Sequence, residues 1–177
     1  MRQTVALADP TLAPLAALKD WLAITGSGED ALLADCLAAA LALCESFTGR
    51  FPLAAIVTER LPASGGIAVS RPVRRVESVV AIAADGVPRP LAPGDYAASI
   101  DCDGGLTVRP AAAITEAILE IRLEAGLAAD WATLDAGLRH GILRHAAHQY
   151  RERDAASTSE LPAAVAALWR PWRRVGL

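Results

Sequence analysis

The chain has 177 residues, of which 53% are hydrophobic and only 5% aromatic, and its formal net charge is −3. A chain of this length can bury roughly 70% of its unfolded surface, so it needs no disulfide or metal to fold, and it is long enough for one domain or one domain with a small insertion. A net charge this small does not by itself indicate a nucleic-acid-binding protein or a membrane-surface protein.

The N-terminal third predicts two helices. In "LAPLAALKDWLAI", Pro14 suits a first turn, and Leu15, Leu18, Trp21 and Leu22 follow at helical spacing. Ser27 and Asp30 resemble a capping box for a second helix over about 29–48, which carries a wide apolar stripe and ends at Gly49. The two segments therefore predict a helical hairpin.

Between about 54 and 124 the pattern changes to short strands separated by turn residues. Asp85-Gly86 is a strong hairpin signal, "DGGLTV" predicts a second hairpin, and "EAILEIRLEAG" alternates as a strand does. Prolines punctuate the region and are expected to exclude long central strands. We expect a small antiparallel meander or sandwich, inserted between helices.

Helices return at about residue 133. Thr133 is expected to cap a helix that extends to about 153, and "LPAAVAALWRPWRR" predicts a short helix that starts near Pro162 and stops at Pro171. The expected fold class is α+β: a helical bundle formed by 1–50 and 130–177, with an inserted antiparallel β region over 54–124.

The segment "LRHGILRHAAHQYRERD" (138–154) contains all three histidines and four arginines. On a helical wheel, the apolar side chains and Tyr150 form one arc and His145 lies at its edge. The opposite face holds His140, Arg144, His148 and Arg151. His140 is far from His145, and we identified no cysteine or carboxylate on this face to complete a metal shell, so no metal site is expected. The expected basic face consists of Arg139, His140, Arg144, His148 and Arg151.

Other chemical sites are not supported by the motifs. "DCDGG" (101–105) opens like a calcium loop, but Leu106 stands where glycine is required and Ala112 where glutamate is required. The helix 29–48 has no lysine or arginine, which argues against its entering DNA as a recognition helix. Because no dinucleotide, P-loop or G-x-S-x-G motif is present, we expect neither an enzyme nor a cofactor.

Cysteine usage and hydropathy point to an intracellular location. Cys36 and Cys44 lie about 12 Å apart on one predicted helix, too far for a disulfide, and Cys102 has no partner in sequence. This pattern is typical of a reduced compartment. The N-terminus shows no basic region followed by an apolar run, and no stretch approaches 18 uncharged apolar residues, so we expect no signal peptide and no membrane span.

The C-terminal end differs from the rest in charge and in aromatic content. Residues 1–50 contain three basic and six acidic side chains, whereas 134–177 contain seven and four. "LWRPWRRVGL" brings together two tryptophans and three arginines, the residue types enriched at interface hot spots. Trp169 fits either core closure or docking, whereas docking is the better interpretation for Trp172, Arg173 and Arg174.

Several segments in this order and spacing resemble the head–tail connector (adaptor) proteins of tailed phages and gene transfer agents, in the branch with a β insertion. The resemblance spans nearly the whole chain, although each motif is short and degenerate. This chain departs from the family in being rich in alanine. It also has "GLAADWATLDAGL" where the family would have a proline before the third helix. The segments are "LAALKDWLAI", "EDALLADCLAAALALCESFTGR", "IAVSRPVRRVESV", "LAPGDYAAS", "LEAGLA", "LRHGILRHAAHQYRERD" and "LPAAVAALWRPWR".

The resemblance implies a structural protein of a virion or phage-like particle neck, assembled in the bacterial cytoplasm. Family members form a ring, usually of twelve copies, that binds the portal protein, extends the DNA channel and meets the next neck (stopper) protein. DNA would pass without sequence-specific binding. The resemblance places the C-terminal segment against the portal, with the expected anchors Trp169, Arg170, Trp172, Arg173 and Arg174.

Physical considerations add a hypothesis for the ring and leave two alternatives. A head-to-tail ring needs two different complementary patches, and the acidic residues 1–50 and the basic end 134–177 are candidates for these patches. One alternative is a DNA-binding packaging or regulatory protein that uses the basic 138–154 helix on phosphates. The other is an enzyme of unknown type, which would require a pocket with converging polar groups.

Overall fold

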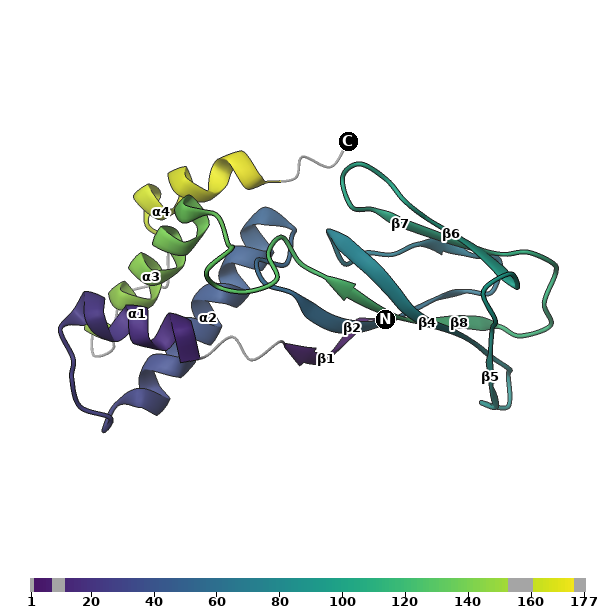
Figure 1. The fold of residues 1–177 in the computed structure, drawn as a ribbon, viewed down its shortest axis with the longest axis horizontal. Helices are drawn as coiled ribbons and strands as arrows, with labels where there is room; N and C mark the ends of the chain where they lie inside the picture. Colours follow the sequence, from purple (N-terminus) through teal and green to yellow (C-terminus); the bar gives the residue numbers. More distant parts are fainter. Residues whose placement is uncertain (1, 8–11, 153–160, 174–177) are drawn as a thin grey trace. The chain divides into compact units, whose positions relative to one another are not determined.

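The computed structural model describes residues 2–7, 12–152 and 161–173 (Figure 1). These residues form both helices and antiparallel sheets, so the chain has an α+β fold. They divide into two compact units. The strand unit comprises Met1–Ala8 and Ala54–Leu127, and the helical unit comprises Asp9–Leu53 and Ala128–Leu177.

The helical unit contains four α-helices and one short 3₁₀ helix among the described residues. Fully buried side chains from all four α-helices, including Leu18, Leu37, Ile142 and Trp169, form its core. The elements are α1 (Leu12–Leu22), α2 (Asp30–Thr48), α3 (Ala136–Arg151), α4 (Ala163–Trp169) and η1 (Arg170–Trp172).

The ends of α2 confirm one prediction and correct another. Gly49 adopts a left-handed conformation with φ of 70°, and its N–H donates to the carbonyl of Glu45, as expected for a C-terminal glycine. The expected capping box at Ser27 and Asp30 is wrong, because no side chain caps the helix at its first residue. The Asp30 carboxylate instead accepts a hydrogen bond of 2.6 Å from Lys19 Nζ of α1.

The third helix also starts later than expected. Asp135 caps α3, because its Oδ1 accepts hydrogen bonds from the backbone N–H groups of Gly137 at 2.8 Å and Leu138 at 3.3 Å. Thr133 lies in the preceding turn, where its N–H and hydroxyl both donate to Asp130 Oδ1. The short helix α4 follows Pro162, as the sequence predicts.

The strand unit consists of two antiparallel sheets. The five-stranded sheet has the order β1-β2-β8-β4-β5, and the three-stranded sheet has the order β3-β7-β6. The strands are β1 (Arg2–Leu7), β2 (Ala55–Pro62), β3 (Gly66–Ile67), β4 (Val73–Ile82), β5 (Pro88–Pro90), β6 (Tyr96–Ile100), β7 (Leu106–Pro110) and β8 (Ile118–Ala125).

Both expected hairpins are present, but the strand order differs from a simple meander. β4 and β5 pair across Asp85 and Gly86, and β6 and β7 pair across 101–105. β8 has eight residues and lies centrally, between β2 and β4, so the expectation that prolines exclude long central strands is wrong. The prolines of the paired strands lie in β5 or at strand ends, which leaves β8 and β4 without an internal proline.

The first strand changes the expected division of the chain. The sequence assigned 1–50 to the helical part, but Arg2–Leu7 forms β1 and pairs antiparallel with β2 over Leu7↔Ala55 to Arg2↔Glu59. The structure therefore groups the first residues with the strands and not with α1.

One described helix, α2, is long and apolar enough to cross a membrane by length and composition. The core helix of a soluble protein meets the same criteria, and one third of the qualifying window in α2 is buried within the protein. Leu33, Leu37, Ala40 and Cys44 are the apolar side chains that α2 buries.

Candidate functional site

The helix α3 positions the predicted basic face. Leu138, Ile142 and Ala146 are fully buried, as the helical wheel indicates, and His145 is buried beside them. Tyr150 joins α3 to the start of α2, because its hydroxyl donates a hydrogen bond of 2.5 Å to Glu29 Oε2. One side of α3 therefore lies in the core of the helical unit, which leaves the opposite side to solvent.

Four of the five residues of the basic face, His140, Arg144, His148 and Arg151, lie on this outer side, whereas Arg139 follows Leu138 at the edge of the buried side. His140, Arg144 and Arg151 are exposed, and Arg139 and His148 are half-buried. None of the three arginines forms an ion pair with a residue that the structure describes. Their guanidinium groups are thus available to a partner with acidic groups.

Two neighbours of this face were missed by the sequence analysis. His140 contacts Trp21 of α1 edge to face, with ring centroids 5.2 Å apart. Trp21, which follows Leu18 at helical spacing, is 41% exposed, whereas Leu18 is fully buried. Glu152, one turn after His148, lies 3.2 Å from His148 Nδ1, so a carboxylate does reach this face. The i, i+4 spacing of His148 and Glu152 was the available signal.

His145 lies apart from the basic face. Its side chain is 1% exposed, and neither ring nitrogen has a hydrogen-bond partner among the described residues. Burial, and then repulsion from His148, lower the pKa of His145 below its ordinary value. The ring centroids of His145 and His148 are 6.5 Å apart. Within the described residues, no three His, Cys, Asp or Glu side chains gather closely enough to hold a metal ion.

The C-terminal anchors fall into different environments. Trp169 is fully buried and contacts Phe47 and His145, so its side chain belongs to the core and is not available for docking. Gly141 makes this packing possible, because a Cβ at that position would lie 2.3 Å from Trp169 Nε1. The sequence left two interpretations of Trp169 open, core closure and docking, and the burial of its side chain supports core closure.

The remaining anchors lie on the surface of the helical unit. Arg170 and Arg173 are exposed, and Trp172 is half-buried. The Arg173 guanidinium lies over the ring of Phe47, 5.5 Å from its centroid, which is a cation–π contact. Arg174 lies outside the described residues.

The acidic part of the helical unit is only partly free. Asp30 pairs with Lys19 and Glu29 accepts from Tyr150, so both carboxylates serve internal contacts. Asp20 and Asp35 are exposed. The acidic counterpart that the ring hypothesis needs therefore rests mainly on the exposed carboxylates of α1 and α2.

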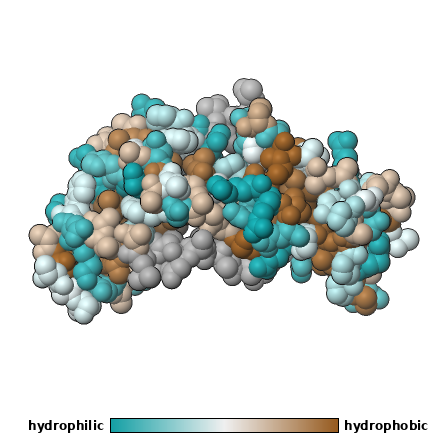
Figure 2. Space-filling view, in the orientation of Figure 1, coloured by the Kyte–Doolittle hydropathy of each residue, from teal (hydrophilic) through white to brown (hydrophobic). Residues whose placement is uncertain are grey.

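The outer face of the five-stranded sheet carries a network of ion pairs that the sequence analysis did not identify. Alternation along β8 directs Leu119, Ile121 and Leu123 into the core and the charged residues between them outward. The pairs are Arg60–Glu120, Arg74–Glu124, Arg75–Glu124, Arg75–Glu77 and Arg122–Glu77. Figure 2 shows hydrophilic residues interspersed with hydrophobic ones on the face in view.

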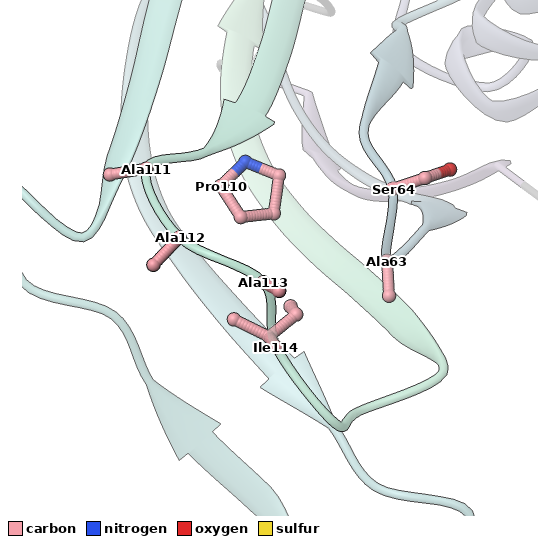
Figure 3. A pocket seen from close by; sticks show the side chains of 7 residues that line it. All are labelled: Ala63, Ser64, Pro110, Ala111, Ala112, Ala113 and Ile114. Carbon is pink, nitrogen blue, oxygen red and sulfur yellow. The ribbon is translucent and has the colours of Figure 1, made fainter.

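A shallow pocket of about 460 Å³ lies in the strand unit, between the turn after β2 and the segment at the end of β7 (Figure 3). Its lining has no titratable side chain, so the hydroxyl of Ser64 has no general base beside it among the lining residues. The lining residues are Ala63, Ser64, Pro110, Ala111, Ala112, Ala113 and Ile114.

Comparison with known proteins gives one consistent result. No protein-family model matches the chain, and no curated protein matches it. Three solved structures are similar to it at 26% identity, covering 100% of this chain and 97% of theirs. They are the neck of an empty gene transfer agent particle computed with C6 symmetry, the virion of a native gene transfer agent particle, and the neck of a native particle computed with C12 symmetry. The TM-scores are 0.81, 0.81 and 0.80. The chain is therefore similar, over its whole length, to chains in structures of gene transfer agent particles, two of which are structures of the particle neck.

Proposed function

We propose that this chain is a structural protein of a particle neck, a head–tail connector that forms a ring beneath the portal. The observation that carries the proposal is the similarity over 100% of the chain, with a TM-score of 0.81, to a chain from a gene transfer agent neck. Similarity over a full chain argues for a shared place in the particle more strongly than similarity of one domain would. Two of the similar structures were computed with C6 and C12 symmetry, which supports a ring of many copies.

In this proposal the helical unit is the connector core. Ala54–Leu127 of the strand unit is the β region inserted into it, and β1 precedes the helices. The C-terminal segment docks on the portal through Arg170, Trp172, Arg173 and Arg174. The buried Trp169 fixes this segment to the core of the helical unit. The opposite end of the ring meets the next neck protein, and DNA passes through the channel. The assembly takes place in the bacterial cytoplasm and has no catalytic role.

Charge complementarity supports the ring contact. The arginines on the outer side of α3 have no ion-pair partner among the described residues, and the exposed Asp20 and Asp35 lie on α1 and α2. Two different surfaces of opposite charge on one subunit suit a head-to-tail contact that closes by rotation. We propose that Arg144 and Arg151 of one copy face the acidic helices of the next.

The experiment is to mix the purified full-length chain with the portal of the same particle and to image the complex by electron microscopy. The expected result is a ring of twelve copies on one end of the portal. A variant with Trp172→Ala and Arg173→Glu is expected to lose the portal complex, whereas Arg109→Glu, on an exposed strand position, is expected to keep it. A chain that leaves the portal bare would overturn the proposal.

A mobility-shift assay separates this function from the DNA-binding alternative. The connector is expected to show little affinity for duplex DNA, because a channel that lets DNA slide has few phosphate anchors. Tight binding at low salt with a steep salt dependence, abolished by Arg144→Glu with Arg151→Glu, would favour the DNA-binding protein.

A further inference from the structure

The two sheets of the strand unit have four edge strands among the described residues: β1 and β5 in one sheet, β3 and β6 in the other. An edge strand presents a row of unpaired backbone N–H and C=O groups, and proteins commonly protect such edges with prolines, charges or very short strands. The four edges differ in this protection.

Two of the edges are protected. β5 has only three residues, and two of them, Pro88 and Pro90, have no N–H to offer. Arg89 between them forms an ion pair with Glu116. β3 has two residues and begins with Gly66. Neither edge is suited to pairing with a further strand.

The edge of β6 lacks these devices. β6 runs for five residues, Tyr96–Ile100, without a proline or a charged side chain. The hydrogen bonds that flank its ladder with β7 run from Asp101 N–H to the carbonyl of Gly105 (2.9 Å) and from Ala111 N–H to the carbonyl of Asp95 (2.8 Å). Since hydrogen-bonded pairs alternate along an antiparallel ladder, the odd-numbered residues of β6 bond to β7. The backbone groups of the even-numbered Tyr96, Ala98 and Ile100 therefore point away from β7.

The core side of β6 is also uncovered. Ala98 lies opposite Val108 and Ile100 opposite Leu106, so these side chains share the face that the sheet turns to the core. Leu106 and Val108 are 0% exposed, but Ile100 is 44% exposed and Ala98 is exposed as well. A strand added beside β6 would therefore continue both the hydrogen-bond ladder and the apolar layer.

The remaining edge belongs to β1. β1 has six residues, "RQTVAL", contains no proline, and pairs with β2 alone among the described strands. Its protection is partial: it begins with Arg2, and its register with β2 shifts between Thr4 and Ala6. The chain thus offers two edges of similar length without a proline, in different sheets. Two different surfaces that complement each other are what a head-to-tail ring contact requires.

We propose that β6 of one copy pairs with β1 of the next copy, so that the three-stranded sheet of each subunit continues into the five-stranded sheet of its neighbour. This inference rests on the proposed ring. Backbone hydrogen bonds supply the affinity in strand addition of this kind. The occupant is a second copy of this chain, because β1, which pairs with β2 on one side, offers its other edge over a similar length, and the similar neck structures were computed with C6 and C12 symmetry.

A proline at position 98 tests the contact directly. Ala98→Pro removes an N–H that points away from β7, so the β6–β7 ladder stays intact while the added strand loses a hydrogen bond and meets the proline ring. Ring formation with the portal is expected to weaken about tenfold or more. The matched control Ala98→Thr keeps the N–H and is expected to form rings like the unaltered chain.

Hydrogen exchange keeps the test decisive if Ala98→Pro folds poorly. In the unaltered chain, the amides of Tyr96, Ala98 and Ile100 are expected to exchange rapidly before assembly and slowly in the ring. Unchanged exchange at these amides in intact rings would overturn the inference.

Cysteine cross-linking identifies the occupant. In a Cys102→Ser background, Ala98→Cys combined with Gln3→Cys or with Thr4→Cys is expected to give a ladder of covalent oligomers in the ring, and each single cysteine is not. A cross-link from position 98 to the portal or another neck protein would overturn the second-copy occupant. Rings that form normally in Ala98→Pro, together with no cross-link in either double-cysteine variant, would overturn the strand contact but leave the connector. An unaltered chain that forms no ring at all would overturn the proposed function as well.

Discussion

The helical unit and the strand unit stabilise their interiors in different ways. In the helical unit, the indole N–H of Trp169 and both ring nitrogens of His145 are buried without a partner among the described residues. In the strand unit, Glu59 is 2% exposed, but its two carboxylate oxygens accept the N–H groups of Val69 at 2.7 Å and Ser70 at 2.6 Å. The helical unit thus contains buried rings that packing alone holds, and the strand unit contains a buried carboxylate that hydrogen bonds hold.

The difference indicates which changes each unit tolerates. A buried ring without hydrogen bonds is held by the volume it fills, so changes in side-chain size should matter most around Trp169. A buried carboxylate that serves two amides is held by those bonds, so the loss of an acceptor should matter most at Glu59. Four substitutions or conditions test this contrast.

The largest effect on stability is expected at Trp169. Trp169→Ala should lower the free energy of unfolding of the helical unit by about 3–5 kcal/mol, because it leaves a cavity between α2, α3 and α4. Circular dichroism during urea unfolding measures the change. Trp172→Ala, on the same segment but half-buried, serves as the control and should cost much less; equal losses would contradict the core role of Trp169.

A somewhat smaller effect is expected at Glu59. Glu59→Ala leaves the N–H groups of Val69 and Ser70 without their acceptor. Ser70 is buried, so its N–H is expected to cost about 1–3 kcal/mol, whereas Val69 is 71% exposed and its N–H can bond to water instead. Amide hydrogen exchange should show the destabilisation in β2 and in residues 68–71. Glu120→Ala on the exposed side of the same sheet is the control, with an expected change of at most about 1 kcal/mol. Similar losses of unfolding free energy in both variants would show that the buried Glu59 carboxylate stabilises the sheet no more than an exposed carboxylate does.

Acid should destabilise the helical unit through His145. The folded protein lowers the pKa of His145, so the unfolded chain binds its proton first as the pH falls below about 6.5. Stability from the neutral imidazole is therefore complete above that pH and declines as the pH falls toward the folded-state pKa. Urea unfolding at pH 7.5, 6.5 and 5.5 measures the decline, which His145→Leu should reduce and the exposed His140→Leu should not. A slope unchanged by His145→Leu would rule out this origin.

The smallest effect on stability is expected on the basic face. Arg144→Glu with Arg151→Glu should change the free energy of unfolding by only about 0.5 kcal/mol, because both side chains are exposed and unpaired among the described residues. Ring assembly with the portal should nevertheless weaken, whereas lysine at both positions should preserve it. Intact rings in the doubly reversed variant would show that these charges do not set the ring contact.

Local signals predicted much of the fold. Gly49 ends α2, and Asp85-Gly86 marks a hairpin, because each depends on a backbone conformation that few residues adopt. The alternation of β8 was equally readable. The strand β1 was missed because it pairs with β2 about fifty residues away, and no local pattern encodes that contact. The same holds for the position of β8 between β2 and β4.

The interaction surface was predicted in part. Helical periodicity placed the basic residues of α3 on one side, since a 16-residue helix gives a clear period. α4 has only seven residues, about two turns, which are too few to predict from periodicity whether Trp169 faces the core or the solvent. The signal that could have settled it is Gly141, a glycine inside α3, which forms the slot for the Trp169 ring.

The packing of Trp169 against Gly141 also has a consequence for the order of folding during synthesis. The last strand of the strand unit ends at Ala125, so that unit is complete while the ribosome is still making the third and fourth helices. The helical unit contains the later of the two C-terminal boundaries and lacks its central ring until residue 169 emerges. Because domains generally fold as units during synthesis, the later segment of this chain is expected to find the strands already paired and to close the helices last.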